Sequence, residues 1–422
     1  MLLFGGVTLL PLQWFVVGAG LRLHIVVILL VGIGMALLVT EDDLRRVVKI
    51  GAPFIVANAM IVAIWTATTL YHGLGLRPVA QQGAFLFSFV AVAAGVHATF
   101  SRDLDRAARL LRWSGLASAV VLVSALSYSM IVNGVNPAVV FGKTLAAGDP
   151  EILQKELFKS AFVGFGFDES TVRGNIRHEV FGALLLAMTL ASVAVHLRPP
   201  ATAVQRWLYR GSLVLGAGLI VLSMSRSVMI AAVIWPLLLQ VRALQAGRVS
   251  RNFALILAGG VAVVSALLAL GLAQVLWVRF TQDTSSYDKR DQLLSDAFAN
   301  LTHAAFSGGV QTASASSHNF VIDTWLRAGV VAAGAAAVVL VVVGYWFLSQ
   351  TMRLHREPVW MVPTTAMLAL PLVRFVTAGG GLVPPVSWMT IAIVVGLLAY
   401  RRSSRAEETA AAEPTPATAG VR

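Results

Sequence analysis

The residues best suited to chemistry lie in one stretch of the sequence, from Asp283 to Gly329, where polar residues run directly into an apolar segment. An amphipathic helix is predicted to begin near Arg290, because the apolar residues that follow recur at helical spacing. These residues are Leu293, Leu294, Ala297, Phe298 and Leu301. A Gly/Ser-rich tether over 307–317 then leads to His318 and Asn319. We expect the functional residues to gather here, with the few polar groups elsewhere that reach this place.

The apolar segment itself begins with a polar stripe. Asn319, Asp323 and Arg327 stand at i, i+4 and i+8, so they share one face of a helix. An Asp–Arg pair inside a span commonly holds helices together, and we assign that role to Asp323 and Arg327. His318 precedes the helix at the water boundary, where the positive end of the helix dipole and nearby arginines favour a neutral imidazole. A neutral imidazole is what a general base requires.

Four further cations, at three places in the sequence, stand out by their surroundings. Arg226 interrupts the apolar sequence LSMSRSVMIAAV, where it either snorkels to the interface or holds an anionic ligand. Arg173 and Arg177 are spaced i, i+4 at the end of a long loop, which is explained equally by an ordinary solvated loop end. Arg290 lies among acidic residues and by itself reads as a charged loop face.

Several common chemistries find no support in the sequence. There is no cysteine, no HExxH pattern and no cluster of acids with histidines, so we expect no bound metal. There is no Walker-type or GxGxxG loop, so we expect no nucleotide and no cofactor. The arginine fork matches the oxygens of phosphate and pyrophosphate. A lipid-linked pyrophosphate is therefore the natural ligand for arginines beside a lipid phase.

The composition defines an integral membrane protein. Of the 422 residues, 57% are hydrophobic and 12% are charged, about half the charged share of soluble domains. The net charge of +12 does not indicate nucleic-acid binding, because the basic residues are scattered among short loops. We expect an all-α helical bundle with about twelve spans, each long enough to cross the bilayer. They are approximately 2–19, 23–40, 50–70, 84–100, 113–133, 179–196, 208–224, 227–241, 253–277, 319–348, 359–377 and 386–400.

The connecting loops predict the orientation. Basic residues fill the loops on one side of this layout: 41–49, 101–112, 197–207, 242–252, 353–356 and 401–405. The positive-inside rule places that side, and both termini, in the cytoplasm. The long loops at about 134–178 and 278–318 then lie outside and carry amphipathic segments. Residues 1–400 form a single transmembrane domain, and 401–422 is an Ala/Pro/Glu-rich tail that we expect to be disordered.

Four short motifs occur in a meaningful order. They are S-x-SR at Ser223–Arg226, D-x-S-x(4)-R at Asp283–Arg290, GG at 308–309 and HNF-x(2)-D at His318–Asp323. In this order, and over about residues 140 to 350, the chain resembles the bacterial O-antigen ligase/O-antigen polymerase superfamily. The resemblance implies a GT-C-like fold in the bacterial inner membrane and a periplasmic, metal-independent glycosyltransferase of lipopolysaccharide biosynthesis.

The resemblance also implies roles for individual residues. Arg226 and Arg290 look like the arginines that bind the donor diphosphate, and Arg173 or Arg177 supplies a further cation. His318 looks like the base that activates the acceptor, with Asn319 and Asp323 in support. The donor is then a glycan on undecaprenyl pyrophosphate, and a ligase passes it to lipid A–core oligosaccharide. A polymerase would instead extend a second lipid-linked glycan, and a polytopic transporter or flippase is the alternative from another class.

Overall fold

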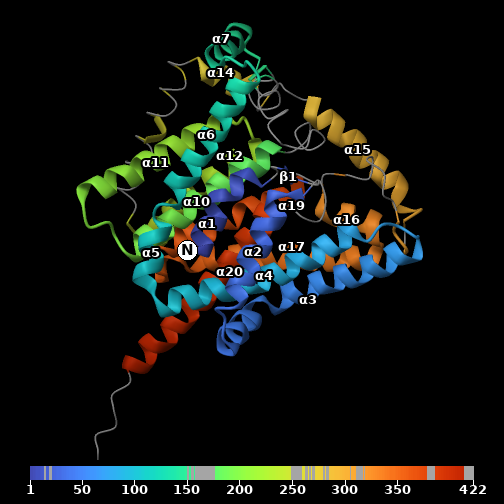
Figure 1. Cartoon of the computed structure of the whole chain (residues 1–422), viewed down its shortest axis with the longest axis horizontal. Coiled ribbons are helices and arrows are strands. Elements are labelled where there is room, and N and C mark those ends of the chain that lie inside the picture. Colours follow the sequence, from blue (N-terminus) through green and yellow to red (C-terminus); the bar gives the residue numbers. More distant parts are fainter. Residues whose placement is uncertain are drawn as a thin grey trace, which may run out of the picture.

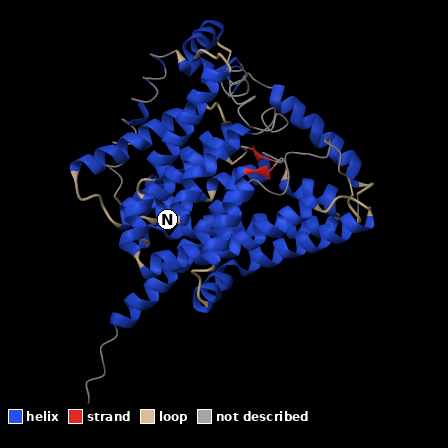
Figure 2. Cartoon of the chain, viewed as in Figure 1, coloured by secondary structure: helices blue, strands red, loops and turns tan. Residues whose placement is uncertain are grey.

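The computed structural model describes the chain except for residues 14–15, 19–20, 150–151, 154–155, 157–175, 249–258, 262–264, 266–267, 269–270, 279–280, 282–284, 305, 310–316, 318, 378–384 and 413–422. Side chains of some residues in helices, Arg177 and Arg290 among them, also lie outside the described part. The described chain is helical except for one short antiparallel hairpin of β1 (Val16–Gly18) and β2 (Leu21–Arg22) (Figure 2). The predicted all-α class is therefore confirmed.

The first half of the bundle contains α1 (Leu2–Leu9), η1 (Leu10–Leu12), α2 (Leu23–Ala36), α3 (Glu41–Tyr71), α4 (Arg77–Arg102), α5 (Leu104–Leu111), α6 (Ser114–Val132), α7 (Pro137–Ala147) and α10 (Ile176–Leu197). The second half contains α11 (Ala203–Leu222), α12 (Arg226–Gln245), α14 (Leu272–Trp277), α15 (Ser285–Leu301), α16 (Phe320–Ala328), α17 (Val330–Arg353), η5 (Leu354–Arg356), α18 (Met361–Met367), α19 (Ala369–Thr377) and α20 (Pro385–Ala412). Figure 1 shows α3, α4, α17 and α20 packed together, with α10 inside the bundle.

Six helices of the described part are long and apolar enough to cross a membrane. They coincide with six of the expected spans: Glu41–Tyr71, Val79–Arg102, Leu104–Val132, Glu179–Leu197, Arg226–Gln245 and Val330–Arg356. The multi-pass character read from the sequence is therefore borne out. The helix α10 is buried along residues 179–194, as expected for a helix surrounded by protein.

Three expected spans differ from the structure in where their helices begin, end or break. The continuous span 2–19 is wrong, because α1 ends at Leu9 and the chain passes through a 3-10 turn at Pro11 into β1. The span 319–348 is broken at Gly329 into α16 and α17, and the span 359–377 is broken at Leu368. Pro371 explains the second break, since it has no amide to pair with the Met367 carbonyl.

The first part of the tail, residues 401–412, is helical and not disordered as expected. α20 continues to Ala412 instead of losing structure after residue 400. Alanine, glutamate and arginine are strong helix formers, and Arg401 forms an ion pair with Glu408 at 3.3 Å across the last turns. Residues 413–422 lie outside the described part.

Aromatic packing ties the large helices together. Phe54 of α3 is fully buried and lies 4.7 Å from Phe89 of α4, ring centroid to centroid. Its ring is also 5.4 Å from Trp388 of α20 and 6.0 Å from Trp346 of α17. Aromatic contacts of this geometry contribute about 0.5–1.5 kcal/mol beyond the burial of area. These contacts therefore join α3, α4, α17 and α20 into one packed unit.

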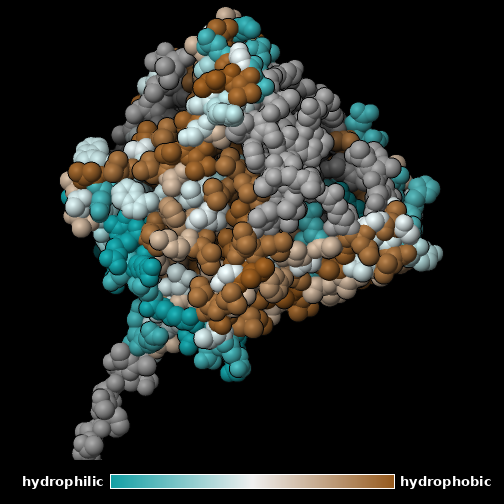
Figure 3. All heavy atoms as spheres, in the orientation of Figure 1, coloured by the Kyte–Doolittle hydropathy of each residue, from teal (hydrophilic) through white to brown (hydrophobic). Residues whose placement is uncertain are grey.

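The basic segments gather at one end of the bundle, which we call the basic end. Arg102 donates to Asp43 at 2.7 Å, and Arg46 donates to the Ser403 hydroxyl at 2.6 Å. Figure 3 shows the corresponding hydrophilic surface at the lower left, over α5 and the start of the tail. Three further pairs join the other basic segments: Arg198 with Asp105, the Arg242 guanidinium with the Leu354 carbonyl, and Arg401 with Glu357.

Candidate functional site

Short helix α19 connects the elements that carry the expected site residues. It packs against α12, which begins at Arg226, and its Phe375 ring stacks on Phe320 of α16 with centroids 4.9 Å apart. Its Arg374 pairs with Glu179 in the first turn of α10. The first turns of α10 and α16 therefore meet at α19, which also packs against α12. We call this meeting point the outer end, because it lies opposite the basic end.

The Glu179–Arg374 pair is the most deeply buried ion pair of the described chain, with side chains only 4% and 2% exposed. Arg374 Nη2 donates to Glu179 Oε1. The second carboxylate oxygen, Oε2, and the Arg374 Nε and Nη1 groups have no hydrogen-bond partner in the described structure. Burying two charges without satisfying all of their hydrogen bonds lowers the stability of the fold. The pair is therefore a candidate for a functional role in addition to helix packing.

The sequence analysis missed Arg374. The signal was present, since Arg374 is the single charged residue in the expected span 359–377. A charge at membrane depth is a functional candidate on that ground alone. What the sequence does not reveal is the partner, because Glu179 lies 195 positions away.

The S-x-SR motif forms the tight reversal between α11 and α12. Met224 takes a left-handed conformation with φ 52°, the one non-glycine residue in the described chain to do so. Buried Ser223 supports it by accepting from the Ser225 amide at 3.2 Å. The half-buried Arg226 is then the first residue of α12, where its charge adds to the positive end of the helix dipole. The motif therefore presents a cation at a helix N-terminus, an arrangement that suits an anion.

Two polar residues fix the backbone on either side of position 318. Asn319 is the N-cap of α16, and its Oδ1 accepts from the amides of Val321 at 3.0 Å and Ile322 at 3.3 Å. Asp323 is buried, and its Oδ1 accepts from the Ser317 amide at 2.6 Å and the Ser317 hydroxyl at 2.8 Å. Their supporting role is thus structural and local. The electrostatic attraction between Asp323 and Arg327 is present as well.

Replacing Asp323 with alanine is expected to cost about 1–3 kcal/mol in the free energy of unfolding, since it leaves buried Ser317 donors unpaired. It is also expected to lower any activity that depends on His318. Thermal unfolding and hydrogen exchange of the Ser317 region measure these effects. Asp296→Ala, an exposed aspartate on α15, is the matched control. Equal, small effects from both variants would contradict the anchoring role.

The GG motif allows the outer loop to close against the break between α16 and α17. The Gly309 amide donates to the Arg327 carbonyl at 3.1 Å, and His72 at the end of α3 contacts the Ser307 carbonyl at 3.2 Å. Gly308 has φ +60°, and a Cβ there would lie 2.6 Å from backbone atoms of Arg327. Position 308 therefore has no room for a side chain, because its backbone lies directly against the backbone of Arg327.

Gly308→Ala is expected to detach this contact and to destabilise the outer end by more than the roughly 1 kcal/mol of a left-handed alanine. Gly134→Ala is the matched control, because Gly134 has φ +64° and open space around its Cβ position. Limited proteolysis and thermal unfolding compare the two. A Gly308 variant no less stable than the Gly134 variant would contradict the close packing.

The predicted amphipathic helix exists as α15 and lies along α16 (Figure 1). Ala297 and Ala304 are buried and pack with Leu326 of α16, while Phe298 is 54% exposed. The predicted apolar face is therefore confirmed in part. Arg290 lies in the first turns of α15, and its side chain is outside the described part.

The predicted site residues are covered unequally by the structure. Arg226, Asn319 and Asp323 are described with their side chains. Arg177 and Arg290 are placed by backbone in α10 and α15 only. His318 and Arg173 lie outside the described residues. Within the described ranges, no group of three or more acidic or histidine residues is arranged to hold a metal.

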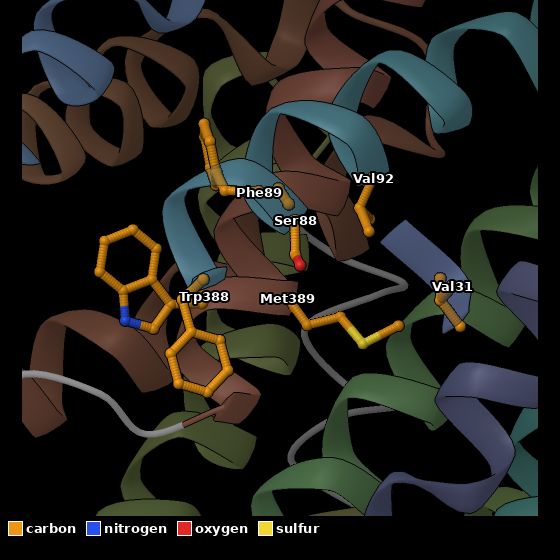
Figure 4. A pocket seen from close by; sticks show the side chains of 8 residues that line it. Val31, Ser88, Phe89, Val92, Trp388 and Met389 are labelled. Carbon is orange, nitrogen blue, oxygen red and sulfur yellow. The ribbon is translucent and has the colours of Figure 1, made fainter. Parts of the chain in front are cut away.

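A small cavity elsewhere in the bundle does not serve as the site. It measures about 20 Å³ and lies among α2, α4 and α20, with Val31, Phe89, Trp388 and Met389 around Ser88 (Figure 4). The Ser88 hydroxyl there has no hydrogen-bond partner among the described residues. A volume of this size admits about one water molecule, and no substrate.

No protein-family model matches this chain, and no curated protein matches it. The assignment of function therefore depends on the residues and their geometry.

Proposed function

We propose that this protein is a metal-independent, inverting glycosyltransferase of the O-antigen ligase type. In this proposal the chain forms a GT-C-like bundle of about twelve spans in the bacterial inner membrane, with both termini in the cytoplasm. It transfers O-antigen glycan from undecaprenyl pyrophosphate to lipid A–core oligosaccharide on the periplasmic face. The acceptor class and the donor class both follow from the family resemblance of the motifs.

One observation supports the proposal: the helices that begin with the described motif residues, α12 and α16, both contact α19. Arg226 begins α12, the Ser317–Asp323 contact fixes the start of α16, and α19 touches both helices. The basic end supports the orientation, since six basic segments are joined there by hydrogen bonds and ion pairs. By the positive-inside rule the outer end then faces the periplasm.

The chemistry needs a base, a leaving group and a fixed positive charge. In our proposal His318 accepts the proton of an acceptor hydroxyl, whose oxygen attacks the anomeric carbon of the donor sugar. The bond from that carbon to the lipid diphosphate breaks, with inversion, and the diphosphate leaves with the bonding electrons. Arg226 and Arg290 stabilise its charge, with Arg177 or Arg173 as a further cation. Fixed cations of this kind replace the divalent metal of other transferases.

Arg226→Lys and Arg290→Lys are each expected to reduce transfer more than tenfold, with only partial recovery relative to alanine, because lysine lacks the bidentate fork. The measurement is the initial rate of transfer at subsaturating donor. Arg210→Lys on the exposed face of α11 is the matched control. Full activity of a lysine variant would show that a point charge is sufficient at that position.

The function is tested with purified protein in detergent, in the presence of EDTA and without nucleotide. One reaction contains undecaprenyl-pyrophosphate-linked glycan with lipid A–core, and a second contains the same donor with another lipid-linked glycan. Transfer to lipid A–core is the expected result. Chain extension alone would identify a polymerase. Absence of transfer in both, with donor movement across liposomes, would identify a flippase.

A further inference from the structure

The basic end contains a pocket that the proposed transferase chemistry does not use. It has a volume of about 510 Å³ and lies between α3 and α20. Its rim carries the cations Arg46, Lys49 and Arg402 with one acid, Glu407, and buried Ile50 lines it together with alanines of α20. Three cations and one carboxylate give this rim a net charge of +2. The pocket is thus cationic at its rim and apolar in its wall.

These cations differ from their neighbours in lacking acidic partners. Arg102, Arg198 and Arg401 at the same end each form an ion pair with a carboxylate. In the part of the chain that the structure describes, Lys49 and Arg402 have no hydrogen bond or ion pair. Most donor groups around this pocket are therefore available to a ligand.

Arg46 is the exception, and its partner is a hydroxyl rather than an acid. It donates to Ser403 Oγ at 2.6 Å with Nη1, which leaves its other guanidinium nitrogens uncommitted. A buried chain of contacts holds that hydroxyl: Asp43 Oδ1 lies 2.8 Å from His97 Nδ1, and His97 Nε2 lies 3.2 Å from Ser403 Oγ. Asp43 also accepts from Arg102, so it is a carboxylate and His97 Nδ1 is the donor. The position of Arg46 is therefore set from the interior before any ligand arrives, which lowers the cost of binding.

We propose that this pocket binds the phosphate of an anionic phospholipid. Phosphate oxygens accept hydrogen bonds from arginine and lysine, and the apolar wall suits the glycerol and the first methylenes of a lipid. Basic pockets between membrane helices on the positive side of a bundle are suited to such headgroups. The inference stands apart from the transferase proposal, since its residues lie at the opposite end of the bundle.

Native mass spectrometry of the full chain in detergent tests this site. Phosphatidylglycerol is expected to remain bound at about 25-fold lower lipid concentration than phosphatidylcholine, since each of the two net positive charges of the rim contributes about fivefold to anionic-lipid binding. The triple variant Arg46→Gln/Lys49→Gln/Arg402→Gln is expected to lose this preference. The control triple Arg206→Gln/Arg248→Gln/Arg353→Gln removes the same charge from exposed positions at the same end. It is expected to keep the preference.

Three results would overturn the proposal. The first is equal retention of both lipids by the wild-type chain. The second is equal loss of preference in both triple variants, which would reduce the effect to the general charge of this end. The third comes from a separate measurement of thermal unfolding with inorganic phosphate. If phosphate raises the unfolding midpoint of the wild type but not of the pocket variant, and phosphatidylglycerol is not retained, the occupant is a free anion. The unfolding midpoints of both triples also confirm that they fold.

Discussion

Arg374→Ala is expected to lower the free energy of unfolding by about 3–5 kcal/mol, because it leaves the buried Glu179 carboxylate without its counter-charge. The pair joins α10 to α19 in a region where both side chains are almost fully excluded from solvent. Arg198→Ala is the matched control, since it breaks a solvent-exposed pair with Asp105 whose attraction is screened by water. Thermal unfolding in the same detergent compares the two variants.

A double variant separates the structural role of this pair from a role in the site. Glu179→Leu/Arg374→Met removes both charges and is expected to recover most of the lost stability, because apolar residues often replace a buried ion pair without net cost. If the recovered protein also recovers transfer, the pair only holds the helices together. We expect transfer to remain low, since Arg374 contacts the first turn of α10 and lies on α19, which packs against both α12 and α16. Equal stability of Arg374→Ala and Arg198→Ala would contradict a charged pair.

His318→Ala is expected to reduce glycan transfer by about 10²- to 10⁴-fold, the usual contribution of a general base. Donor binding and the unfolding midpoint are expected to remain close to those of the wild type, because Asn319 and Asp323 supply the local anchoring. Single-turnover transfer at saturating donor measures the chemical step. His303→Ala is the matched control, an exposed histidine on the same outer loop.

This experiment distinguishes two roles for His318: general base and part of the diphosphate-binding site. Near-normal turnover of His318→Ala would remove the general-base assignment but would leave the proposed donor-binding role of the arginines untouched. A loss of donor binding together with turnover would instead place His318 in the diphosphate site. Loss of transfer alone supports the proposed division of roles between His318 and the arginines.

The sequence by itself determined the class of this protein and the local features of its motifs. Apolar runs longer than a bilayer crossing require helices, because lipid offers no partner to exposed backbone groups. The Asn319 cap that begins α16 consists of local hydrogen bonds between residues two and three apart. The grouping of the basic loops also follows from local composition and the alternation of spans. Such features depend on near neighbours, and near neighbours are visible in a sequence.

The tertiary structure decided which distant residues meet. The partner of Arg374 is Glu179, and that of His97 is Asp43, separations that no periodicity encodes. The helix break at Gly329 also depends on a contact between distant residues, since a Cβ at Gly329 would lie 2.1 Å from the Phe306 carbonyl oxygen of the outer loop. Hydrophobic patterning fixes which face of a helix is buried, but the crossing of helices depends on side-chain packing between elements far apart in the chain. The ion pairs, the break at Gly329 and the basic pocket are products of that packing, whereas the break at Leu368 follows locally from Pro371.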